Sequence, residues 1–175
     1  AQVKKHDIEL EFVGARKESY HRDSRNPIVE DGTLEEDQNR RDFTINALME
    51  DVLTGEIIDP FGGKVDLQNK VIRHIDDKTF VEDPLRVLRG AQFAARFGFD
   101  IAPETVKLCK GIDISTLTRE RIEEEHKKGL LKGIKPSVFF EALRDMNQLD
   151  IWFPELKSLI GLDQDPVFHP EGDVW

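Results

Sequence analysis

The 175-residue sequence has little cysteine, no long apolar run and a deficit of positive charge. Its single cysteine, Cys109, excludes an intrachain disulfide and favours a reducing, cytoplasmic setting. No apolar run reaches the roughly 18 residues that a membrane span needs, and the first residues lack the plan of a signal peptide. The net charge of −10 argues against a general nucleic-acid binder, because such binding depends on neutralising phosphates with Lys and Arg.

The sequence also lacks an initiator methionine, internal repeats and low-complexity segments. Its charged fraction of 34% and hydrophobic fraction of 38% are typical of a globular chain. A strand pattern begins almost at once, and the last residues, FHPEGDVW, form no polar tail. We therefore expect both ends to be cut, so that the chain is an internal fragment of a longer polypeptide.

The first 70 residues carry strand and loop patterns. Alternating apolar and acidic residues predict a half-buried strand at 8–13, and the Gly, Ser, Asn and Pro content of 14–32 predicts a long loop. Thr33 and Glu36 form a capping box, which predicts a helix that runs to residue 51. Short strands are expected within TGEIIDPFGG and at VIRHI. The rest of the chain has helical periodicity, with helices expected near 83–97, 103–111, 118–132, 136–147 and 154–160.

The stretch VEDPLRVLRGAQFAARFGF places Asp83 and Arg86 three residues apart at the start of a helix. Pro84 suits the first helical position, so Asp83 is the natural N-cap, and the pair could form a salt bridge. A second interpretation follows from hydrogen bonding, because a carboxylate only accepts and a guanidinium only donates. Cytosine and adenine both present an amino donor beside a ring-nitrogen acceptor. Asp83 and Arg86 together could therefore select C or A over U and G.

The stretch RRDFTINA, residues 40–47, places two arginines next to an acid. Adjacent guanidinium groups can grip phosphates through charge-assisted hydrogen bonds. Asp42 could accept from a ribose hydroxyl, and Asn46, four residues later, would share its face of a helix. The alternative is a charged start of a helix whose apolar residues form core.

Glu9 and Glu11 lie on one face of the first predicted strand. Two carboxylates there could hold Mg²⁺, which prefers oxygen ligands, or could simply face solvent. The sequence has one D-x-D stretch, at 163–165, and it falls in a late loop with no strand or Gly-rich turn before it. We interpret that stretch as a loop feature.

The order of these stretches resembles the bacterial-type tRNA nucleotidyltransferases, or CCA-adding enzymes, and the related bacterial poly(A) polymerases. The resemblance rests on GTLEEDQNRRDFTINALMEDVLTGEIIDPFGGKVDL followed by VEDPLRVLRGAQFAARFGF and then RERIEEEHKKGL. These match the family's second to fourth motifs and the helix motif after them, and the similarity covers roughly residues 8–160. It implies an α+β fold, in which the C-terminal part of a nucleotidyltransferase head with a mixed β-sheet precedes an all-α neck and the start of an all-α body. The implied domains are 1–68 for the head, 69–134 for the neck and 135–175 for the body.

The resemblance also implies roles for individual residues. Glu11 matches the strand acid that assists the two metal-binding aspartates, which makes it the implied catalytic and metal residue. Asp59 to Gly63 match a hinge between head and neck, and Glu82 matches a support for the base-reading pair. The implied nucleotide-binding residues are Arg41, Asp42, Asn46, Asp83, Arg86, Arg89 and Arg121, with Asp83 and Arg86 reading the base and Arg121 bracing them.

Three departures from the family pattern bear on these roles. The Gly-rich loop and D-x-D that hold two Mg²⁺ ions in the family are not found before residue 8. His126 and Gly129 stand where the family usually has apolar residues, which puts the packing of that helix in question. The tRNA-binding tail is missing, and FHPEGDVW resembles the start of an HD phosphohydrolase domain found in some relatives.

The resemblance implies part of an Mg²⁺-dependent, cytoplasmic enzyme that adds C, C and A to tRNA 3′ ends from CTP and ATP and releases pyrophosphate. The expected partners are CTP, ATP, the tRNA 3′ end and a missing N-terminal segment acting in trans, with no membrane. A poly(A) polymerase or a relative that adds only CC or only A would share the same motifs. A non-catalytic nucleotide- or RNA-binding half of a split protein is the alternative from another class.

Overall fold

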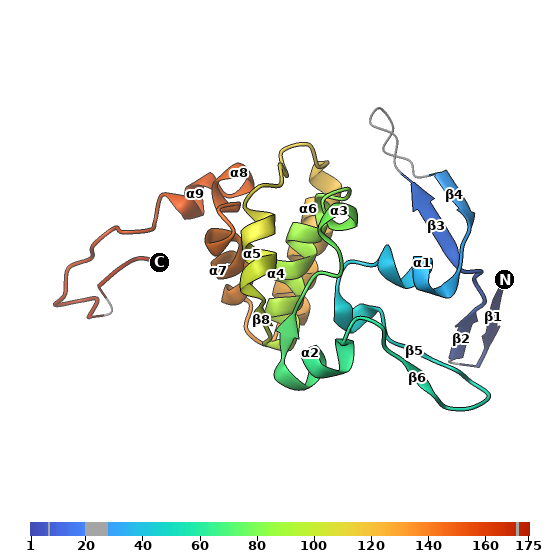
Figure 1. The fold of residues 1–175 in the computed structure, drawn as a ribbon. Coiled ribbons are helices and arrows are strands. Elements are labelled where there is room, and N and C mark those ends of the chain that lie inside the picture. Colours follow the sequence, from blue (N-terminus) through green and yellow to red (C-terminus); the bar gives the residue numbers. More distant parts are fainter. Residues whose placement is uncertain (7, 20–27, 171) are drawn as a thin grey trace.

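The computed structural model describes residues 1–6, 8–19, 28–170 and 172–175. Figure 1 shows a bundle of helices at the centre, with small hairpins on the N-terminal side and a C-terminal segment that extends away on the other side. The order of elements confirms the α+β class, because strands dominate the N-terminal part and helices dominate the part after residue 76.

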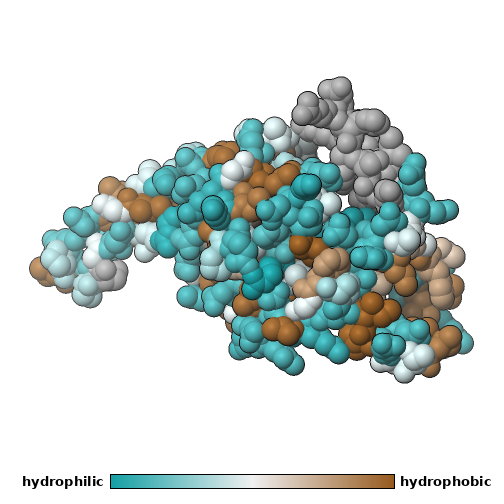
Figure 2. Space-filling view, in the orientation of Figure 1, coloured by the Kyte–Doolittle hydropathy of each residue, from teal (hydrophilic) through white to brown (hydrophobic). Residues whose placement is uncertain are grey.

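The first hairpin pairs β1 (Gln2–Lys5) with β2 (Ile8–Glu11) in antiparallel register. The predicted strand is therefore confirmed, but its half-burial is wrong. Every residue of β1 and β2 that the structure describes is exposed, because the two strands form a sheet of their own with both faces open. Figure 2 shows apolar side chains gathered on this side of the molecule, where Ile8, Leu10 and Phe12 are exposed.

The second hairpin overturns part of the loop predicted at 14–32. Strands β3 (Arg16–Ser19) and β4 (Ile28–Asp31) pair antiparallel, from Arg16 with Asp31 to Ser19 with Ile28. The remainder of the predicted loop at 20–27 lies outside the described residues. Residues 16–19 and 28–31 therefore pair as strands, although the Gly, Ser, Asn and Pro content of 14–32 favours a loop.

The capping box at Thr33 is confirmed, but the helix that follows is shorter than predicted. The Thr33 hydroxyl accepts from the Glu36 N–H, and the Glu36 carboxylate accepts from the Thr33 N–H. Helix α1 (Leu34–Asn39) then ends, and a 3₁₀ turn η1 (Thr44–Asn46) and strand β5 (Met49–Glu50) follow. The chain leaves the helix because Phe43 is fully buried in the core of the helical part and pairs with His74 in a β-bridge.

The DPFGG stretch forms a packed corner. It follows β6 (Ile57–Ile58), which pairs antiparallel with β5, and leads into α2 (Gly63–Asn69), a helix that was not predicted. The Asp59 carboxylate accepts from the Gly63 and Lys64 N–H groups at 2.7 and 2.9 Å and so caps α2. A Cβ atom on Gly63 would lie 2.3 Å from the Thr44 carbonyl oxygen, so only glycine allows α2 to approach η1 this closely.

The helical part is built around α4 (Leu85–Phe97), which packs against α6 (Arg119–Lys132) and α7 (Ser137–Asp145). The five predicted helices are confirmed within a few residues, although the last, α9 (Pro154–Lys157), is shorter than expected. Strand β7 (Val71–Ile72) is also confirmed, and it pairs in parallel with an unpredicted β8 (Asp100–Ile101). Helix α5 (Pro103–Cys109) is one of the five predicted helices. Two further short helices, α3 (Asp77–Phe80) and α8 (Leu149–Trp152), were not predicted.

Two unusual residues of α6 fit together in this packing. A Cβ atom on Gly129 would lie 2.8 Å from the ring of Phe139, so the glycine makes room for a fully buried phenylalanine of α7. His126, one turn earlier, lies with its ring centre 5.2–5.6 Å from those of Phe139, Phe140 and Phe153. Burial lowers the pKa of His126 and favours its neutral form. The helix therefore packs well with both departures from the family pattern.

Candidate nucleotide-binding site

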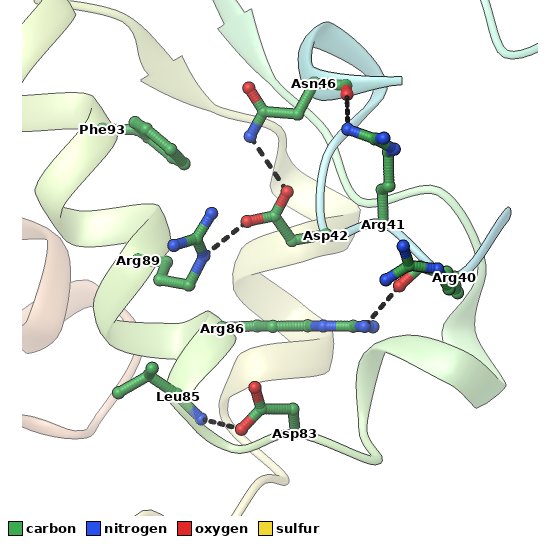
Figure 3. Close-up of a pocket in the computed structure, with 9 residues that line it drawn as sticks. All are labelled: Arg40, Arg41, Asp42, Asn46, Asp83, Leu85, Arg86, Arg89 and Phe93. Atoms are coloured by element: carbon green, nitrogen blue, oxygen red, sulfur yellow. Dashed lines mark hydrogen bonds and ion pairs between the residues drawn. The ribbon is translucent and has the colours of Figure 1, made fainter. Parts of the chain in front are cut away.

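A cavity of about 510 Å³ lies where the start of α4 faces the segment between α1 and η1. Its volume is in the range of small-molecule sites, and arginine dominates its lining. Figure 3 shows side chains from both segments converging on this space. The lining residues are Arg40, Arg41, Asp42, Asn46, Asp83, Leu85, Arg86, Arg89 and Phe93. Two stretches about 40 residues apart, both singled out in the sequence, thus meet at one site.

Arg86 is held in place by backbone rather than by Asp83. Its side chain donates to the Thr79 carbonyl at 2.6 Å and to the Arg40 carbonyl at 2.5 Å, and the residue is only 8% exposed. The guanidinium also lies 5.9 Å from the centre of the Phe80 ring. The predicted salt bridge between Asp83 and Arg86 is therefore replaced by two carbonyl contacts. Because a guanidinium has five N–H groups, donors remain for a ligand in the cavity.

Asp83 makes the capping contact that the sequence predicted, although Pro84 stands at the N-cap of α4 rather than at its first helical position. Its Oδ1 accepts from the Leu85 N–H at 3.2 Å, and α4 begins at Leu85, one residue after Pro84. The same carboxylate accepts from Nη2 of Arg121 at 3.0 and 3.2 Å, so an arginine of α6 braces it. Arg121 is not part of the cavity wall, and its printed contact among the described residues is with Asp83. Its expected role as a brace agrees with this geometry, whereas its expected contact with nucleotide remains a prediction.

Glu82 precedes this pair and is absent from the cavity wall. Burial raises the pKa of the Glu82 carboxyl, while the charge of Arg86 lowers it and that of Asp76 raises it, with a net upward shift. The predicted role of Glu82 as a support for Asp83 and Arg86 remains a prediction.

Asp42 is buried and binds three partners. Its Oδ1 accepts from the Phe43 N–H at 2.8 Å and from Asn46 at 2.9 Å, and its Oδ2 accepts from Arg89 Nε at 2.6 Å. Asn46 therefore does meet Asp42, but across a 3₁₀ turn rather than along the predicted α-helix. Arg89 comes from α4, so this cluster also joins the two sides of the cavity (Figure 3).

Arg40 and Arg41 share one carboxylate, that of Asp37, which the sequence reading missed. Oδ1 of Asp37 accepts from Nε and Nη2 of Arg40 at 3.0 and 2.7 Å, and its Oδ2 accepts from Nη2 of Arg41 at 3.0 Å. Burial alone would raise the pKa of Asp37, but hydrogen bonds from Arg40, Arg41 and the Arg16 N–H outweigh it and lower the pKa. The available signal was the acid three and four residues before the two arginines.

Glu11 lies apart from this cavity, on the exposed strand β2. Among the described residues, no three or more His, Cys, Asp or Glu side chains are grouped so that they could hold a metal ion. The described side chains therefore do not form a metal site by themselves, and the metal role of Glu11 remains a prediction. The same part of the chain contains no helix that is both long and apolar enough to cross a membrane.

The chain matches known proteins along most of its length. A family model described as the poly(A) polymerase head domain matches residues 1–73. A protein of Haemophilus ducreyi, named multifunctional CCA protein, is 49% identical over 148 residues, which cover 81% of this chain and 35% of that protein. These similarities support membership of the CCA-adding enzyme family. The family resemblance that the motifs indicated is thereby confirmed.

Solved structures of this family share the fold. A structure described as a tRNA-processing enzyme with CTP is 32% identical, with a TM-score of 0.68 over 94% of this chain and 42% of that one. A structure described as a CCA-adding enzyme with ATP is 34% identical, with a TM-score of 0.63 over 70% of this chain and 30% of that one. The chain spans about a third of the length of the curated relatives it matches.

Proposed function

We propose that this chain is the nucleotide-selecting part of a tRNA nucleotidyltransferase that adds C, C and A to tRNA 3′ ends from CTP and ATP. One observation carries the proposal: a single cavity contains both the acceptor–donor pair Asp83 and Arg86 and the polar cluster around Asp42. Relatives described with CTP and with ATP support the choice of nucleotides. A reducing compartment suits the single cysteine, so we propose a cytoplasmic location.

One wall of the cavity would bind the base of the nucleotide, and the other would bind its phosphates and ribose. On the α4 side, the carboxylate of Asp83 accepts from the amino group of C or A, and the remaining donors of Arg86 meet the ring acceptors. On the opposite side, Arg41 grips phosphate oxygens and Asp42 accepts from a ribose hydroxyl. Because the base-reading pair belongs to the protein, selection between nucleotides needs no nucleic-acid template.

Nucleotidyl transfer in this family implies a divalent metal, for which we propose Mg²⁺. When bound, the metal would activate the attacking 3′-hydroxyl and bind the triphosphate. Glu11 is the described residue that would assist, and the described residues alone do not group enough further ligands to hold the metal. What the chain itself contributes is the binding and orientation of the nucleotide.

We also propose that residues 1–68 belong to the head, 69–134 to the neck and 135–175 to the start of the body. The family match to the head domain, which ends at residue 73, supports the first boundary. The burial of Phe43 among the residues of α4 means that head and neck share one core at this boundary.

The proposal is tested with a chimera in which this chain replaces the matching third of the Haemophilus ducreyi relative. The chimera receives tRNA that lacks its CCA end, with CTP and ATP supplied separately and together. The expected products are two added C residues with CTP alone and a complete CCA end with both nucleotides. Long A tracts would instead indicate a poly(A) polymerase. Addition of U or G as readily as C and A would contradict the proposed role of the cavity.

A further inference from the structure

The geometry points to Asp37 as a positioning residue that sets the phosphate-facing arginines and, through the Arg40 carbonyl, the base-reading guanidinium of Arg86. This inference rests on the proposed function and adds a residue and a coupling to it. Asp37 lies outside the cavity wall, so it acts on a nucleotide only through other residues.

The carboxylate of Asp37 is held in a fixed position. Asp37 is 5% exposed and is fixed by its place on α1 and by the Arg16 N–H of β3, which donates to its Oδ1 at 3.2 Å. Helix α1 is anchored independently, since the neighbouring Gln38 is buried and donates to the Ala47 carbonyl at 2.7 Å. The carboxylate of Asp37 therefore has a fixed position and can hold the side chains of Arg40 and Arg41 in place.

Asp37 holds two arginines of the cavity wall, Arg40 and Arg41. Adjacent guanidinium groups repel each other, and free arginine side chains have many rotamers to lose on binding. The shared carboxylate holds both, so a triphosphate would meet side chains that are already oriented. Arg41 is held from a second side as well, because its Nη1 donates to the Asn46 carbonyl at 3.2 Å. The side chain of Arg41 remains 41% exposed, which leaves part of it open to a ligand.

The backbone of Arg40 links the phosphate side of the cavity to the base side. The carbonyl of Arg40, whose side chain is tied to Asp37, accepts from Nη2 of Arg86 (Figure 3). The other carbonyl that holds Arg86 belongs to Thr79, whose hydroxyl donates to the Asn39 carbonyl at 3.3 Å. Both supports of Arg86 are thus connected to the C-terminal end of α1. A shift of this segment would move Arg86 and change its aim at the base.

The test uses the 175-residue chain and measures its affinity for CTP and UTP by calorimetric titration. Asp37→Asn keeps the shape of the side chain but replaces an acceptor oxygen with an amide donor that faces a guanidinium. We expect the affinity for CTP to fall about tenfold. Without the carboxylate, the two arginines lose their side-chain freedom only when the nucleotide binds, and this loss of entropy opposes binding. We also expect the ratio of CTP to UTP affinity to fall by about fivefold, the lower end of what one base contact supplies.

Asp51→Asn is the matched control. It removes the same charge from a carboxylate that accepts from two backbone N–H groups, those of Leu53 and Thr54, and that is not part of the cavity wall. Both the affinity and the ratio should stay at their wild-type values. If Asp37→Asn does not fold, Arg40→Lys replaces it, because an ammonium keeps the charge but cannot make both contacts with Asp37. The ratio should fall in that variant too.

Two outcomes would contradict the positioning role of Asp37. If Asp37 only neutralises charge, removing it makes the site more positive, so CTP and UTP both bind more tightly and their ratio does not change. That outcome, or an unchanged affinity and ratio, overturns the inference while leaving the proposed function intact. A wild-type chain that binds CTP and UTP equally would instead contradict the proposed function.

Discussion

Replacing Asp83 by asparagine separates the capping role of this side chain from its base-reading role. In the structure the carboxylate caps α4 through the Leu85 N–H and is braced by Arg121. Asparagine caps a helix about as well as aspartate, so the cap survives the change. It cannot form the ion pair, and its amide presents a donor where the amino group of C or A needs an acceptor.

The expected loss of stability is small. The Asp83 and Arg121 side chains are 25% and 46% exposed, so their ion pair contributes about 0.2–1 kcal/mol after solvent screening. For a chain of this size, 1 kcal/mol corresponds to about 2–4 °C in melting temperature. The expected loss of selectivity is larger, because one base contact supplies about 1–3 kcal/mol of discrimination. That range corresponds to a decrease of roughly 5- to 150-fold in the preference for C and A over U and G.

The assay measures incorporation of each of the four nucleotides by the chimera, together with its melting temperature. Arg121→Ala is the control, since it removes the same ion pair but leaves the Asp83 carboxylate as an acceptor. It should melt like the asparagine variant and keep most of the wild-type selectivity. If Asp83→Asn also keeps wild-type selectivity, Asp83 is a helix cap and an ion-pair partner, and the base-reading role is wrong.

Three further outcomes are expected. The 175-residue chain alone should incorporate no nucleotide, because its described residues form no metal site; Mg²⁺-dependent addition of CMP or AMP by the purified chain would contradict this. In the chimera, Arg41→Ala should weaken the use of CTP and ATP to the same degree, since a phosphate contact does not read the base, and a loss confined to one nucleotide would exclude this role. Burial lowers the pKa of His126 below its ordinary value of 6.5, so the unfolded chain binds this proton more readily than the folded chain. The free energy of unfolding, measured with urea, should therefore decrease as the pH falls from 6.5 towards the folded-state pKa of His126. This decrease should be smaller in His126→Phe. If the decrease is equal in both proteins, groups other than His126 cause it.

Local signals predicted the elements that depend on local contacts. The capping box at Thr33 and Pro84 at the start of α4 are set by neighbours in sequence, and both are present. The helix predicted to run to residue 51 is wrong because burial of Phe43 against distant residues outweighs helical propensity. The hairpin β3–β4 was missed for a related reason, since strand pairing stabilised it in a segment whose composition favoured a loop.

For the site, the sequence by itself determined the chemical types, and the tertiary structure decided their partners. Side-chain chemistry offered phosphate and base contacts as one of two interpretations of RRDFTINA and of the Asp83–Arg86 pair, and the family resemblance favoured it. Six residues of these two stretches line one cavity. The sequence could not show that Arg86 is held by the carbonyls of Thr79 and Arg40, because backbone carbonyls carry no residue-specific signal. It also could not show that Arg89 reaches Asp42 across 47 positions. Contacts of this range form only when α4 packs beside the segment after α1, and that packing is a property of the whole core.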